Sequence, residues 1–155
     1  MTTASEWMLA VMSCALLLAS RCSSPQTAGP EHASTDTRER LRLPAAHRDK
    51  ILLEMRLMLE AMDRVLQALG QDDVAAAGKA ARGAGMAMAV DVEPEIQKVL
   101  PKNFLDLGMR THQAFDALDD RLEAGGSKDD AIQGLAGLTG NCVGCHASYR
   151  LDESP

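Results

Sequence analysis

Three side chains near the C-terminus have the types and spacing of a covalent cofactor site. Cys142, Cys145 and His146 form a C-x-x-C-H motif, and the other two cysteines lie within the first 22 residues. In c-type haem attachment the two thiols form thioethers with the porphyrin, and the imidazole binds the iron. On a helix, residues i, i+3 and i+4 share one face. We therefore predict one covalently bound haem c, attached at Cys142 and Cys145, with His146 as an axial iron ligand.

Other uses of the cysteine pair fit the sequence less well. A dithiol redox site places C-x-x-C at the start of a helix that follows a strand, and no strand is predicted before Cys142. A structural zinc site needs four ligands, whereas this cluster offers three. A disulfide between helical positions i and i+3 has unfavourable geometry. A haem-free thiol redox protein using Cys142 and Cys145 remains an alternative.

Helices are expected to position this motif. The chain has 155 residues, nine of them Met and only 3% aromatic, a composition that favours helices over sheet. Apolar periodicity and end signals predict four helices. The first begins after Pro44 and ends at Gly70, and the second runs from Asp73 to about Val90. The third covers Lys102 to Ala124, and the fourth starts at a Ser127–Asp130 capping box. Mostly short connections predict an all-α fold, an antiparallel four-helix bundle with haem on the C-terminal helix.

Two weaker signals lie around the second helix. Its many Ala and Gly residues either allow close approach of a neighbouring helix or a flat cofactor, or are simply helix filler. Residues 91–101 contain two prolines and are expected to form the connection to the third helix, with room for one helical turn.

The N-terminal segment carries targeting signals. The apolar run from Trp7 to Ala19 has the length of a signal-peptide core and is too short to span a bilayer. We expect residues 1–22 to be a signal peptide or a lipoprotein signal, with a possible lipid anchor at Cys22. Residues 23–43 are polar and rich in Ser, Thr and Pro, which predicts a flexible linker. The folded domain is expected over 44–151, exported to the periplasm or outer cell envelope, because c-type haem is normally attached after translocation.

The net charge of the chain limits the classes of partner that it can bind. A net charge of −6 disfavours nucleic acid and anionic membrane surfaces. It favours a redox partner protein with a basic patch.

The C-terminal run GNCVGCHASYRL resembles the class II c-type cytochromes, the cytochrome c′ and cytochrome c-556 group. In that family the haem motif lies on the last helix of a four-helix bundle and is followed by a Tyr-Arg or Tyr-Lys pair, which Tyr149 and Arg150 match. The resemblance extends more loosely over Pro44 to Leu151. It implies that Arg150 lies near the proximal haem face, where it tunes His146 or meets a propionate. The alternative is a cation favoured by the helix macrodipole. Dimerisation is common in the family, so a homodimer is possible.

The resemblance also implies that the first helix meets the other haem face. A Met there binds the iron in low-spin members, and an apolar side chain blocks an open position in high-spin, gas-responsive ones. Met55 is the predicted ligand, with Met58, Met62 and a non-ligating Leu52 as alternatives. A Met stripe at helical spacing is otherwise core filling.

Two histidines could compete as the sixth ligand. His112 is expected to be a hydrogen-bonded residue at the boundary of the third helix, and His47 to be exposed at the start of the first.

These residues predict a single-electron carrier rather than an enzyme. The alternative is a high-spin protein that binds NO or CO at an open iron position. The sequence leaves the choice between Met55 and an open site undecided.

Overall fold

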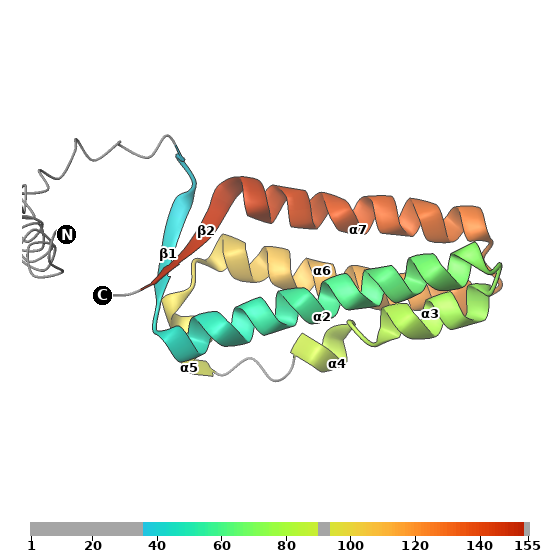
Figure 1. Cartoon of the computed structure of the whole chain (residues 1–155), viewed down its shortest axis with the longest axis horizontal. Coiled ribbons are helices and arrows are strands. Elements are labelled where there is room, and N and C mark those ends of the chain that lie inside the picture. Colours follow the sequence, from blue (N-terminus) through green and yellow to red (C-terminus); the bar gives the residue numbers. More distant parts are fainter. Residues whose placement is uncertain (1–35, 90–93, 154–155) are drawn as a thin grey trace, which may run out of the picture. The chain divides into compact units, whose positions relative to one another are not determined.

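The computed structural model describes residues 36–89 and 94–153. The described chain is mostly helical with a small two-stranded sheet (Figure 1). The longer helices are α2 (Ala45–Gly70), α3 (Val74–Arg82), α6 (Lys102–Glu123) and α7 (Lys128–Ser148). Two short helices, α4 (Met86–Ala89) and α5 (Pro94–Val99), precede α6. The strands are β1 (Glu39–Leu43) and β2 (Tyr149–Glu153).

The longer helices bury a common apolar core. Helix α3 packs against α2 and α6, and α6 packs against α7. We call this core the central cluster; its large fully buried side chains are Val65, Phe115 and Leu138. Around them α3 contributes mainly alanines, among them Ala77 and Ala81, so its backbone can lie close to its neighbours.

Several predicted helix ends are confirmed. Pro44 precedes the first turn of α2, and Ser127 forms a capping box with Asp130 at the start of α7. Helix α6 matches the predicted third helix to within one residue. The end of α2 differs in detail, because Gly70 is still helical and the left-handed residue is Asp72, with φ 57°.

The predicted continuous helix from Asp73 to about Val90 is wrong. Helix α3 ends at Arg82, and a turn over 83–85 separates it from α4; Val90 lies outside the described residues. The small residues do allow close approach of a helix, since a Cβ on Gly78 would lie 2.6 Å from the Asp119 Oδ1 on α6. The short helix α5 fits the single turn expected in the following connection.

The sheet is the largest departure from the predicted all-helical domain. Strand β1 pairs in parallel with β2, with Glu39 opposite Tyr149 and Leu43 opposite Glu153. The predicted linker over 23–43 therefore does not extend to Leu43, and the folded domain begins before residue 44. Leu41 and Leu43 are buried in a second core, which we call the sheet-end cluster; its other buried members are Ile51, Leu100 and Phe104.

The signal segment 1–22, including Cys22, and residues 23–35 of the linker lie outside the described residues. Within the described ranges, no helix has the length and apolarity needed to cross a membrane.

Candidate cofactor site

Helix α7 presents the C-x-x-C-H motif in its last two turns. The capping box holds the start of the helix, and α7 continues to Ser148, so the motif is helical throughout. Cys142 and Cys145 are half-buried free thiols, and His146 is exposed. The predicted arrangement of two thiols and an imidazole on one helix is therefore present.

A cavity of about 230 Å³ lies beside the motif. It collects most of the predicted site residues from separate elements. Leu52 and Met55 reach it from α2, and Cys145 and His146 from α7. Its remaining lining residues are Arg38, Phe104, Tyr149, Arg150 and Leu151. Of all the residues that line the cavity, only Arg38, Phe104 and Leu151 were not predicted from the sequence to lie near the cofactor.

The structure separates the candidate methionines of α2. Met55 packs against the sheet-end cluster, as Cys145 does, and lines the cavity. Met58 and Met62 pack instead against the central cluster and are not among the cavity residues. Cys142 also packs against the central cluster, where its thiol contacts the Leu138 carbonyl oxygen at 3.8 Å. Met55 is thus the one α2 methionine that shares a cavity with His146.

Burial makes both thiols less acidic. It raises the pKa of Cys142 above its ordinary value, and it raises that of Cys145, where the Cys142 charge acts in the same direction. Reactive thiols need a lowered pKa, because the thiolate is the nucleophile. The environment here therefore favours neutral thiols over a dithiol redox pair.

An aromatic pair and a basic pair close the cavity near β2. The rings of Phe104 and Tyr149 meet edge to face, with centroids 5.4 Å apart and planes at 89°. Arg38 Nη1 donates a hydrogen bond of 3.1 Å to the His146 carbonyl oxygen. Asp36 accepts hydrogen bonds from Arg38 (2.7 Å from Nη2) and Arg150 (3.4 Å from Nη1). The Arg38 hydrogen bonds, followed by the positive charges of both arginines, hold the pKa of Asp36 well below its usual range.

Sequence reasoning missed Arg38 and Asp36 because it treated their segment as linker. A signal was present: arginine and leucine alternate from Arg40 to Leu43, the period of a half-buried strand. Alternation over so few residues is weak by itself.

The competing histidines lie away from the cavity lining. His112 is 3% exposed, deeper than the predicted boundary position, and both ring nitrogens are hydrogen-bonded. His47 lies in the first turn of α2 and is half-buried rather than exposed.

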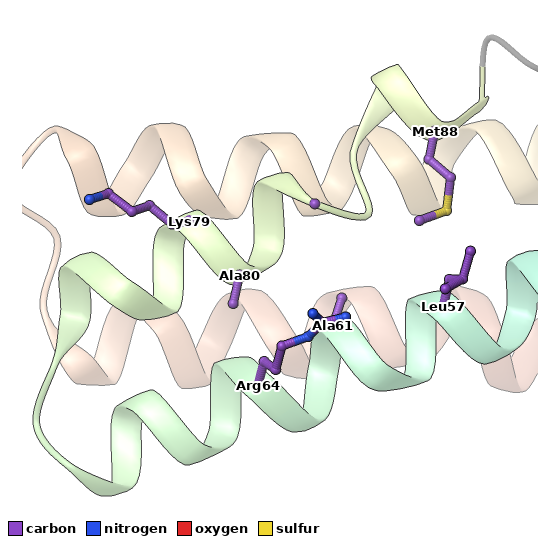
Figure 2. Close-up of a pocket in the computed structure, with 7 residues that line it drawn as sticks. Leu57, Ala61, Arg64, Lys79, Ala80 and Met88 are labelled. Atoms are coloured by element: carbon purple, nitrogen blue, oxygen red, sulfur yellow. The ribbon is translucent and has the colours of Figure 1, made fainter.

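Two other features lack comparable chemistry. A cavity of about 330 Å³ between α2 and the α3–α4 region is lined by Leu57, Ala61, Arg64, Lys79, Ala80, Gly83 and Met88. Leu57 and Met88 extend towards one another across it (Figure 2), and no thiol, imidazole or carboxylate is in the lining. The acidic group Asp119, Asp120 and Glu123 on α6 contacts Arg82, which forms ion pairs with the first two.

Comparisons with protein-family models, with curated proteins and with solved structures gave no match. The likeness to class II cytochromes accordingly rests on the motif and its surroundings in this chain.

Proposed function

We propose that this chain is a c-type cytochrome of the class II kind, an exported four-helix bundle that carries one covalent haem c and transfers single electrons. The observation that carries the proposal is the shared cavity. It brings Met55 of α2 beside Cys145 and His146 of α7, although these residues lie far apart in sequence.

The donor set suits this group. Cys142 and Cys145 would hold the porphyrin through thioethers, and His146 would bind the iron through its imidazole. The buried Nε of Arg150 has no hydrogen-bond partner within the described residues, which marks the cavity wall as a place for an anionic or accepting group. The cavity is smaller than the roughly 300–1,000 Å³ of most ligand pockets. Haem binding must therefore move lining side chains or leave one edge of the haem in solvent. The exposure of His146 fits the second case.

When bound, haem iron supplies one-electron chemistry by alternating between the ferric and ferrous states. The residues of this chain set the conditions. Met55 would complete the iron coordination with its thioether, a ligand that raises the reduction potential. Leu52 and Phe104 would exclude water from the apolar walls. With no substrate transformed, the protein would act on a redox partner, whose basic patch would suit the net charge of −6.

A second function deserves testing because Leu52 lines the same cavity, three residues before Met55 and therefore on the same face of α2. If Leu52 rather than Met55 faces the iron, the sixth position is open to NO or CO. The raised pKa of both thiols weighs against the third candidate, a haem-free thiol redox protein.

The test is to express the full chain in a host with a c-type haem-attachment system. Electron transfer predicts a mass gain of one haem and a low-spin spectrum that CO leaves unchanged. A high-spin spectrum that shifts with CO supports the gas-binding function instead. The double variant C142A/C145A is the control and should retain no covalent haem. A wild-type chain that gains no haem mass would refute both cytochrome functions.

A further inference from the structure

The cavity has a basic corner built from both ends of the described chain. Arg38 lies directly before β1, and Arg150 is the second residue of β2. The parallel pairing of the two strands brings them together, because Arg40 lies opposite Arg150 in the register. Arg38 is tied to the haem motif itself through its hydrogen bond to the His146 carbonyl oxygen.

The ion pairs of this corner join three arginines to two carboxylates. Arg38 and Arg150 both pair with Asp36. The next carboxylate, Asp152, lies 4.0 Å from Arg150 Nε and is shared with Arg40 at 3.7 Å. Three guanidinium groups thus face two carboxylates, in a chain whose net charge is −6.

The hydrogen-bonding capacity of the corner is also incomplete. The Arg150 side chain is 19% exposed, and its Nε is buried with no hydrogen-bond partner within the described part of the chain. A buried donor of this kind costs free energy unless an acceptor reaches it. Planar guanidinium groups match carboxylates geometrically and bind them with paired hydrogen bonds.

We propose that Arg38, together with Arg150, binds the carboxylate side chains of the cavity's occupant, with Asp36 as the residue that positions both guanidinium groups. Resting on the proposed function, this means the haem propionates. The N-terminal segment 36–43 is then part of the cofactor site and not a tether to it.

This assignment has a consequence for the reduction potential. A nearby guanidinium lowers the pKa of a carboxyl group, so the bound propionate loses its proton at low pH. Ionisation of a propionate adds negative charge near the iron and lowers the reduction potential. Without Arg38 the propionate should ionise at higher pH, so the fall in potential should occur about one pH unit or more higher than in wild type. Removing Arg38 should also lower the potential at neutral pH.

The experiment measures midpoint potentials of the haem-loaded full chain between pH 4 and 9 for wild type, R38Q and R42Q. Arg42 is the matched control, since it is an exposed arginine of the adjoining strand β1 and lies outside the cavity lining. R38Q should shift the pH-dependent fall, and R42Q should follow wild type. Equal behaviour of R38Q and R42Q would overturn the proposal, because it would reduce Arg38 to a general surface charge.

A second readout separates cofactor binding from a purely structural role. In the haem-free C142A/C145A background, R38Q removes the hydrogen bond to His146 but no propionate contact. We expect R38Q to destabilise the loaded protein more than the haem-free one. Equal losses would contradict the proposal.

A conservative variant covers the case in which R38Q does not fold. R38K keeps a positive charge without the planar guanidinium group, so the fall in its midpoint potential should move to higher pH by less than in R38Q. If R38K titrates like R42K, the role of Arg38 is refuted.

The two proposals fail in different ways. A wild-type chain without covalent haem refutes the proposed function. A loaded wild-type chain with an unaltered R38Q titration leaves the cytochrome function standing and removes only the role of Arg38.

Discussion

His112 on α6 and Glu54 on α2 form a hydrogen bond of 2.9 Å between Nε2 and a carboxylate oxygen, with the imidazole 3% exposed. The other ring nitrogen, Nδ1, lies 2.8 Å from the Ala84 carbonyl oxygen, which can only accept a hydrogen bond. The imidazole therefore ties α2 and α6 to the turn between α3 and α4. Glu54 directly precedes Met55, so this contact also helps to fix the rotation of α2 that turns Met55 into the cavity.

The stability of the protein should fall as pH rises through the titration of His112. Burial lowers the pKa of His112. The hydrogen bonds to Glu54 and to the Ala84 carbonyl, together with the negative charge of Glu54, outweigh burial, so the pKa in the folded state is raised. The folded state then holds the proton more tightly than the unfolded state. The stabilisation is complete below the unfolded pKa of about 6.5 and is lost above the folded pKa, with a slope of at most about 1.4 kcal/mol per pH unit between them. Urea unfolding of the full chain at several pH values measures it.

The matched variants are H112N and E54Q. H112N should lack the step altogether, and E54Q, which keeps the shape but not the charge of Glu54, should move it to lower pH. Wild type and H112N with parallel pH profiles would show that His112 does not carry the effect.

Met55→Leu should convert a low-spin haem centre into a high-spin one that binds CO. The substitution nearly preserves side-chain volume, so its cost in stability should stay below about 1.5 kcal/mol. Met58→Leu is the control, since Met58 packs against the central cluster and not into the cavity. Visible spectra with and without CO separate the two variants. An M55L spectrum identical to wild type would clear Met55 of ligation.

The sequence predicted the features that depend on local chemistry. Apolar periodicity located α2 and α6, and the Ser127–Asp130 capping box located the start of α7. The C-x-x-C-H motif led to the proposed site residues because its spacing has a chemical meaning, and these residues lie on α7. Strand β1 was missed because its partner strand lies at the other end of the chain and the stability of a strand depends on such pairing. The Glu54–His112 pair was missed for the same reason, since it depends on which faces of two helices meet.

Gly85→Ala should destabilise the protein by about 1–3 kcal/mol, the usual cost of overpacking a close contact. A Cβ at this position would overlap the Asp116 carboxylate. That carboxylate accepts hydrogen bonds from the Met86 N–H at 2.9 Å and from Arg82 Nη1 at 3.0 Å, so it cannot move without losing them. Thermal or urea unfolding measures the loss.

Gly137→Ala is the opposite case and serves as the control. Gly137 is exposed in α7, and a Cβ there would meet nothing within 4 Å. Alanine should therefore stabilise the helix by about 0.5–1 kcal/mol. Destabilisation by G137A, or no effect of G85A, would contradict the packing of α7 or of α6 described above.

Leu43→Ala tests whether the N-terminal segment belongs to the folded domain. Leu43 is 1% exposed in the sheet-end cluster, next to Ile51 and Phe104. Truncating a buried leucine to alanine costs about 2–5 kcal/mol, because the lost transfer energy adds to the cost of a cavity. Arg42→Ala changes an exposed neighbour in the same strand and should alter stability by no more than about 0.5 kcal/mol. In a flexible linker neither substitution would change the stability. Equal unfolding curves for the two variants would therefore show that residues 39–43 belong to a linker. A large loss confined to L43A would show that β1 is part of the folded domain and that Leu43 contributes to its core.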